Sequence, residues 1–331
     1  MARRKSDGQL SFTDVEYAGR PRKGRRQEFL ERMDEIVPWE AWVAIIEPHY
    51  PSGRRGRPPY PIETMLRMYL LQCWFNLSDE ATEDAIYDSF AMRSFMHLDF
   101  SSSRVPDATT LLHFRHLLEE RGLQEALFDA LAEILERSGV MMRGGSIVDA
   151  TIVEAPSSTK NSSGARDPEM HQVRKGNQWH FGMKCHVGVD AGSGLVHTVA
   201  ATPANVADVA EAHRLLREDD RFCYADAGYT GIAKRPEVAS DPRLSAVEWF
   251  VAMRPGKLRA LPERSAERDV ERRKASVRSK VEHPFRIVKG LFGYSKAVYR
   301  GLRKNLCRLH MLFALSNLEM CSAAGRSLLP A

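Results

Sequence analysis

Residues 145–153 read GSIVDATIV, residues 180–190 read HFGMKCHVGVD, and residues 195–201 read LVHTVAA. The first segment is rich in β-branched residues, and the second alternates Met183, Cys185, Val187 and Val189 with other side chains. A Gly192-Ser193-Gly194 turn joins the second segment to the third. Such alternation is typical of strands, and a glycine-rich turn between two such runs predicts a hairpin. We therefore expect three successive strands.

Beyond these strands the pattern alternates between helix and strand. Helices are expected at 206–218, 230–238 and 271–290, with strands at 222–225 and 247–253 between them. Three strands before the first helix exclude a plain Rossmann fold, in which strand and helix alternate from the start. The order predicts an α/β fold, a mixed five-stranded sheet flanked by helices in the order of a ribonuclease-H-like core. A final apolar helix at about 305–321 would pack against it.

The segment before the sheet is expected to be an all-helical domain. Residues 27–47 are helical in pattern with an interruption near Pro38, and Ser78 and Asp107 are expected helix N-caps. The module could read DNA as a helix-turn-helix does, or it could be a packing and dimerisation bundle. The sequence leaves both open. The expected division is a flexible basic arm at 1–26, the helical domain at 27–140, the catalytic domain at 141–322 and a tail at 323–331.

Composition narrows the class of protein. The chain has 331 residues, 43% of them hydrophobic, so it can bury a core. No run approaches the roughly 18 apolar residues of a membrane-spanning helix, and the N-terminus has no signal-peptide pattern. We therefore expect a cytoplasmic, nucleoid-associated protein. The five cysteines are scattered and form no CxxC pair, which argues against a disulfide framework and a structural zinc site.

Positive charge is concentrated in two places. Residues 1–26 hold eight Lys or Arg against three acidic residues, and residues 254–304 hold sixteen against five. The net charge of the whole chain is only +5, so the remainder is acidic. Segregated positive charge is expected where a protein neutralises phosphates, although basic runs also occur as solvated faces. The distribution favours a nucleic-acid partner.

Two aspartates are expected where strands finish, Asp149 after residues 146–148 and Asp226 after residues 222–225. Hard divalent cations prefer carboxylate oxygens on rigid elements, and a pair of such ions can polarise the attacking and leaving oxygens of a phosphodiester. Taken alone, an aspartate at a strand end is more often a turn former or a helix cap. A third group is needed to favour catalysis.

Glu282 is the candidate for that third group. Arg278, Glu282 and Lys289 fall within roughly 40° of one another on a helix at about 100° per residue, so they share a face. A surface salt-bridge ladder is the alternative to a metal ligand flanked by phosphate-binding cations. Pro284 is unfavourable inside a helix, which predicts that the helix bends or restarts near Glu282.

Three segments carry a family resemblance: VDATIVEAP at 148–156, YADAGYTG at 224–231 and VRSKVEHPFRIVKGLFG at 277–293. They resemble the catalytic blocks of bacterial DDE transposases of the insertion sequence five group, and the last carries that group's Arg-x3-Glu-x6-Lys signature. The group has Tyr three residues before the Arg, where this chain has Ala275. The likeness extends from about Ser11, through residues 59–98 that resemble the group's N-terminal helical domain, to about Leu318.

The resemblance implies a metal-dependent transposase. Asp149, Asp226 and Glu282 would form the catalytic triad and hold two Mg²⁺ or Mn²⁺ ions. The enzyme would cut the ends of an element, and the freed 3′-hydroxyl would attack target DNA. It would act as a homodimer on double-stranded DNA, recognising terminal inverted repeats. A nuclease of the same fold without strand transfer, or a catalytically silent DNA-binding repressor, are the alternatives.

Further side chains are expected to contact DNA. Those near the triad are Tyr229, Arg278, Arg286 and Lys289. Two more, Lys184 and His186, alternate along one predicted strand. The last three lie in the turn-rich basic stretch at 51–61, as Arg54, Arg55 and Arg57.

Overall fold

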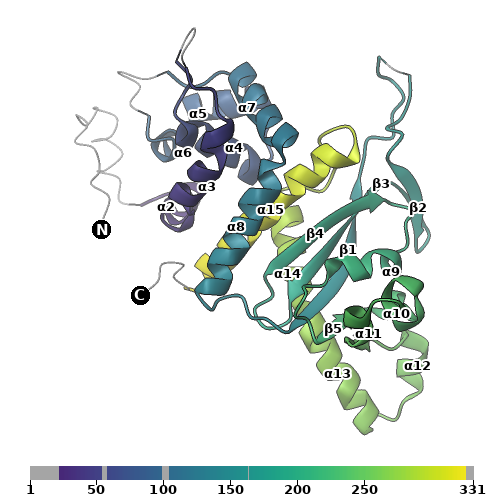
Figure 1. The fold of residues 1–331 in the computed structure, drawn as a ribbon. Coiled ribbons are helices and arrows are strands. Elements are labelled where there is room, and N and C mark those ends of the chain that lie inside the picture. Colours follow the sequence, from purple (N-terminus) through teal and green to yellow (C-terminus); the bar gives the residue numbers. More distant parts are fainter. Residues whose placement is uncertain (1–21, 54–57, 99–103, 163, 326–331) are drawn as a thin grey trace.

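The structure is a computed structural model that describes residues 22–53, 58–98, 104–162 and 164–325. Its first part is helical, as the sequence predicts (Figure 1). The helices are α2 (Arg25–Ile36), α3 (Trp39–Ile46), η1 (Glu47–His49), α4 (Ile62–Phe75), α5 (Asp79–Asp88), α6 (Phe90–Phe95), α7 (Ala108–Arg121) and α8 (Leu123–Arg137). Pro38 separates α2 from α3, so the expected interruption is confirmed.

Both expected N-caps are confirmed. The Ser78 hydroxyl accepts a hydrogen bond from the Ala81 N–H at 3.1 Å, and Asp107 Oδ1 accepts from the Thr110 N–H at 2.7 Å. Each bond satisfies one of the amides that a helix leaves without a partner in its first turn. Gly122, with φ of +64°, ends α7 in the left-handed conformation that glycine adopts without strain.

The sheet has six strands rather than the expected five. They are β1 (Gly145–Glu154), β2 (His171–Lys175), β3 (Gln178–Asp190), β4 (Val196–Pro203), β5 (Phe222–Ala225) and β6 (Glu248–Val251). The order is β2-β3-β1-β5-β6, and β4 pairs with β3. Strand β3 runs antiparallel to β1, β2 and β4, whereas β1, β5 and β6 are parallel. Strand β2 is the addition to the predicted order, and its residues are polar apart from Val173.

Short helices follow β4 and β5, and a longer series follows β6. The first set comprises α9 (Asp208–Glu211), η2 (Ala212–Leu215), η3 (Ala227–Tyr229), η4 (Ile232–Lys234), α10 (Pro236–Ala239) and α11 (Pro242–Ser245). The second comprises α12 (Pro255–Ala260), α13 (Ala266–Arg278), η5 (Ser279–Val281), α14 (Glu282–Arg286), the π-helical turn η6 (Ile287–Leu291) and α15 (Leu302–Ala323). The expected ribonuclease-H-like order of a mixed sheet with flanking helices is confirmed.

The two faces of the sheet contribute to different cores. Ile147, Val153 and Val187 join a large core that includes α15 and the N-terminal helices. Val148 and Ala225 join a smaller core with residues of η2, η4, α10 and α11. Helix α15 packs against both α8 and β4, so it lies between the helical part and the sheet (Figure 1). The large core is therefore continuous across the domain boundary expected near residue 140, and that boundary stays a prediction.

Candidate active site

Asp149 and Asp226 lie at neighbouring positions on two parallel strands. The β1–β5 pairing runs from Gly145 opposite Phe222 to Val148 opposite Ala225, so each aspartate is the next residue after the last pair. Asp149 does not end its strand, as the sequence suggested, because β1 continues to Glu154 beside β3. What ends at Val148 is the parallel pairing, and the two carboxylates meet where the strands separate.

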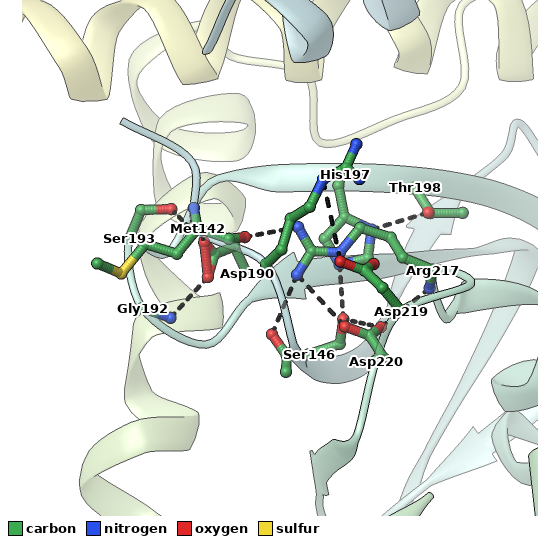
Figure 2. A network of polar contacts seen from close by, with 12 residues as sticks. Met142, Ser146, Asp190, Gly192, Ser193, His197, Thr198, Arg217, Asp219 and Asp220 are labelled. Atoms are coloured by element: carbon green, nitrogen blue, oxygen red, sulfur yellow. Dashed lines mark hydrogen bonds and ion pairs between the residues drawn. The ribbon is translucent and has the colours of Figure 1, made fainter. Parts of the chain in front are cut away.

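A polar network holds the starts of these two strands together (Figure 2). The Ser146 hydroxyl on β1 donates to Asp220 just before β5 and lies 2.9 Å from His197 Nε2. The Arg217 guanidinium donates to the Met142 carbonyl at 2.7 Å and to the Gly145 carbonyl at 3.2 Å. Ser146, His197 and Asp220 are all buried, so this trio of residue types is not an accessible nucleophilic site. Its effect is to fix the register that brings Asp149 beside Asp226.

The segment that carries Glu282 crosses the face of β1 on which Asp149 lies. At one end, Lys280 Nζ donates to the carbonyls of Ala191 and Gly192, at 2.6 and 2.8 Å, in the turn after β3. At the other, Lys289 Nζ donates to Thr151 Oγ1 at 2.6 Å and to the Ile152 carbonyl at 2.7 Å. Ala191 bonds Gly145 at the start of β1, so the segment between the two lysines passes Asp149.

The local helix geometry supports this course. Helix α13 ends at Arg278, a 3₁₀ turn follows, and α14 begins at Glu282, so the predicted restart is confirmed. Pro284 then lies in the first turn of α14, where its missing N–H has no intrahelical partner to lose. The π-helical turn η6 follows Arg286 and includes Lys289, so the winding is wider there than in a regular α-helix.

Electrostatic interactions link Asp149 to the other two acids. The pKa of Asp149 is raised to about 6; burial is the largest cause and the charges of Asp226 and Glu282 add to it, while the Ala150 N–H and the charge of Arg278 act in the opposite direction. Asp149 and Asp226 are half-buried, and Glu282 is exposed. Repulsion among carboxylates at a partly dry site is what a bound divalent cation would relieve.

The carboxylates do not yet form a closed ligand set. In the parts of the chain that the structure covers, no three His, Cys, Asp or Glu side chains are grouped closely enough to hold a metal ion. One oxygen of each aspartate is already used, since Asp149 Oδ1 accepts from the Ala150 N–H at 2.7 Å and Asp226 Oδ1 from the Gly228 N–H at 2.8 Å. Asp226 therefore also caps the turn η3, and its Oδ2 remains for an ion. The donor chemistry fits Mg²⁺, which takes oxygen ligands.

Tyr229 lies beside the aspartates but faces inward. It is 1% exposed, and its hydroxyl has no hydrogen-bond partner among the described residues. Burial raises the pKa of Tyr229, and the charges of Asp149, Asp208 and Asp226 raise it further. Tyr229 is therefore buried in the fold rather than exposed for the predicted contact with DNA. Asp208, in the first turn of α9, forms an ion pair with Lys184, with 2.9 Å between Oδ1 and Nζ.

Two more side chains that were expected to contact DNA, His186 and Lys184, bond other residues of the protein instead. His186 is fully buried, its Nε2 lies 2.8 Å from Thr202 Oγ1, and burial lowers its pKa. Lys184 donates to the Val206 carbonyl at 2.7 Å besides its ion pair with Asp208. Both side chains alternate along β3, but on the face opposite Asp149, because Asp149 pairs with Val187. The predicted strand is confirmed, but Lys184 and His186 lie on the face of the sheet opposite Asp149.

The remaining predicted contacts divide into three groups. Arg278 is half-buried at the end of α13, near Asp149, and Arg286 is exposed on α14. Lys289 is half-buried with its ammonium on β1, and burial lowers its pKa. Arg54, Arg55 and Arg57 lie outside the described residues.

A ribonuclease-H-like sheet with two aspartates brought together on neighbouring parallel strands defines the class of protein. The family models agree with that class. The model described as Transposase DDE domain matches residues 141–318, more than half of the chain, and a second, described as Transposase domain (DUF772), matches residues 20–117. The chain belongs to the DDE transposase family.

One solved structure is similar over most of the chain. It is a cryo-EM structure of the piggyBac transposase synaptic complex with hairpin DNA, 12% identical, with a TM-score of 0.45. The match covers 91% of this chain and 75% of that one. A likeness at this level adds nothing to the assignment. Within the described residues, no helix is both long and apolar enough to cross a membrane.

Proposed function

We propose that this protein is a DNA transposase of the insertion sequence five group, of bacterial origin, that cuts the ends of its element and joins them to target DNA. Membership of the DDE transposase family supports the general activity. The observation that carries the proposal is the register that ends the β1–β5 pairing at Val148 and Ala225, with Asp149 and Asp226 next in line. The Glu282 segment, anchored at Lys280 and Lys289, supplies the third carboxylate.

Asp149, Asp226 and Glu282 would hold two Mg²⁺ or Mn²⁺ ions. Such ions act as Lewis acids on phosphodiester oxygens and favour deprotonation of bound water. Asp149 on β1, Asp226 just after β5 and Glu282 at the start of α14 would bind the ions, and the Arg278 guanidinium, whose charge lowers the pKa of Asp149, could neutralise a phosphate there. Arg286, exposed one turn beyond Glu282, is placed to contact the same backbone.

The partners follow from the chemistry. The substrate would be double-stranded DNA, both the terminal inverted repeats and the target, and the enzyme would act as a homodimer on it. The basic segment at 254–304 would neutralise backbone phosphates. Such a protein would act at the nucleoid. The helical domain would read the repeats or mediate dimerisation.

The test is cleavage and joining with matched variants. The DNA is a plasmid carrying the coding region with its native flanks, incubated with purified protein and Mg²⁺. Wild type is expected to nick at the element ends and to join 3′ ends to a second plasmid. Asp226→Asn and Glu282→Gln should lower both rates at least 100-fold, because an amide is a weak ligand for a hard ion. Glu218→Gln, at another exposed glutamate, should leave them unchanged.

Other outcomes discriminate the alternatives. Cleavage without joined products would indicate a nuclease of the same fold. DNA binding with no Mg²⁺-dependent cleavage would indicate a repressor. Normal cleavage by Asp226→Asn would refute the triad.

A further inference from the structure

The β2–β3 hairpin projects beyond the packed part of the sheet. Between Gln172 and His180 no residue is buried, and Trp179 is 66% exposed, the largest value among the exposed large hydrophobic side chains described. This tryptophan contributes to no buried core, so its exposure calls for a functional explanation.

The pairing register shows which side chains share a face. Arg174 pairs with Trp179 and Gln172 pairs with Phe181, so these four lie on one face of the hairpin. Lys175 pairs with Gln178 on the other face. Because side chains alternate along β3, Trp179 also lies on the same face as Val187, which pairs with Asp149. The exposed aromatic and the catalytic carboxylate are therefore on one side of the sheet.

Cations accompany the aromatic rings on that face. The Arg166 guanidinium lies over the Phe181 ring, 5.4 Å from its centroid. Arg174 donates to the Gly176 carbonyl at 3.2 Å and to Asn177 Oδ1 at 3.4 Å, so it is oriented across the hairpin turn with further N–H groups available. A held guanidinium loses less conformational entropy when it binds a phosphate.

The acidic side chains that follow Arg166 in the chain, Asp167 and Glu169, bond the start of α15. Asp167 Oδ2 accepts from the Gly301 N–H at 2.6 Å, and Glu169 accepts from the Leu302 N–H. Both carboxylates thus cap the start of α15 instead of neutralising the hairpin. The backbone of Lys296, an exposed residue, bridges to Glu154 at the end of β1. Arg166 and Arg174 are therefore the cations that accompany Phe181 and Trp179 on this face of the hairpin.

We propose that the β2–β3 hairpin is a DNA-binding arm in which Arg174 and Trp179 hold the flank of the duplex being cut. The assignment rests on the proposed function, since it places the scissile phosphate at Asp149. Eight residues separate Trp179 from Val187, or about 26 Å at about 3.3 Å per residue. With about 3.4 Å per base pair, the contact falls about eight base pairs from the scissile phosphate. Arg174 contacts a phosphate, and the indole packs on sugars and base edges in the groove.

Two matched pairs of variants test the arm in the full-length protein. Arg174→Ala is compared with Lys175→Ala, which removes the same charge from the other face. Trp179→Ala is compared with its neighbour Gln178→Ala. Binding to a fluorescein-labelled mixed-sequence duplex of about 40 base pairs is followed by anisotropy over a range of KCl, with EDTA present so that no cleavage occurs.

Arg174→Ala should weaken binding about tenfold and reduce the slope of log affinity against log salt by about one, because one phosphate contact is lost. Trp179→Ala should weaken binding about tenfold with the slope unchanged. Lys175→Ala and Gln178→Ala should both stay within about twofold of wild type. Equal effects of Arg174→Ala and Lys175→Ala, or affinities of Arg174→Ala and Trp179→Ala within about twofold of wild type, would overturn the proposal.

The result is independent of catalysis. If wild type cuts and joins DNA but Arg174→Ala and Trp179→Ala bind normally, the arm is wrong and the transposase proposal stands. If the two variants lose affinity but wild type never cuts, the opposite holds. Unchanged circular dichroism and melting temperature would show that the exposed substitutions leave the fold intact.

Discussion

Lys289 shows how a cation that a sequence pattern assigns to DNA can act within the protein. Its spacing from Glu282 predicts a shared face on one regular helix, whereas the chain passes from α14 into the π-helical turn η6 before it reaches Lys289. Its ammonium, however, bonds Thr151 Oγ1 and the Ile152 carbonyl on β1. A lysine in such contacts fixes the distance between the helix and the strand. We therefore interpret Lys289 as a positioning residue for Glu282.

Lys289→Met keeps the aliphatic stem and removes the two bonds. We expect the rate of DNA cleavage to fall at least tenfold, because a shift of about 1 Å at a catalytic group has an effect of this size or larger. The salt dependence of DNA binding should not change, since no phosphate contact is lost. A slope that falls by about one would restore the phosphate-binding interpretation. Arg286→Met, at an exposed neighbouring cation, is the control expected to alter the slope.

At the level of helices and strands, the sequence predicts what local chemistry decides. Ser78 and Asp107 predict helix starts, and Pro284 predicts the restart at Glu282. The Gly192-Ser193-Gly194 turn predicts the β3–β4 hairpin. Strand β2 differs from the prediction because its residues are polar apart from Val173 and none of them is buried, so only its pairing with β3 defines it.

The sequence predicts the residues of the candidate site, but not the face of the sheet on which each side chain lies. Asp149 and Asp226 could be found as acids after β-branched or aromatic runs. That β1 continues past Asp149 depends on its pairing with β3, which a local pattern does not contain. The sequence also shows that Lys184 and His186 share a face, but not which face, because that depends on which helices cover the sheet.

Asp107 offers a test of local helix chemistry away from the site. Asp107→Ala removes the acceptor for the Thr110 N–H and should lower the free energy of unfolding by about 1 kcal/mol. Asp107→Asn retains a capping oxygen and should stay within a few tenths of a kcal/mol. Urea unfolding of the three proteins measures both. Equal losses for the two variants would show that charge, rather than capping, decides.

The whole molecule is organised around α15, which packs against α8, α2 and α4 on one side and β4 on the other. Buried polar groups accompany it: Asn317 Nδ2 donates to the Val196 carbonyl at 2.7 Å, and Arg308 donates to the Gln72 carbonyl at 2.9 Å. Three buried histidines, His186, His197 and His310, are spread through the fold. Burial lowers the pKa of each.

These histidines give stability a defined dependence on pH. Burial holds the pKa of each below that of the unfolded chain, which is about 6.5, so the folded protein is harder to protonate at these positions. The unfolded state then binds more protons, so their contribution is fully present above about pH 6.5 and is lost as the pH falls below it. We expect the urea midpoint to drop between about pH 7 and about pH 5, before most carboxylates titrate.

His197→Gln isolates one contribution to that drop. The variant retains a side chain able to hydrogen bond with Ser146 but cannot be protonated, so its midpoint should depend less steeply on pH in this range. An identical pH profile for wild type and His197→Gln would contradict the assignment.

Residues 172–180 of the β2–β3 hairpin include no buried side chain. Its sequence is thus under little constraint from folding, in contrast to β1 or β5, where a change of one side chain disturbs a core. Exchanging residues 172–180 for the corresponding loop of a relative should give a chimera that folds as well as either parent. A surface on residues 172–180 can therefore diverge between relatives while the strands that carry Asp149 and Asp226 stay unchanged.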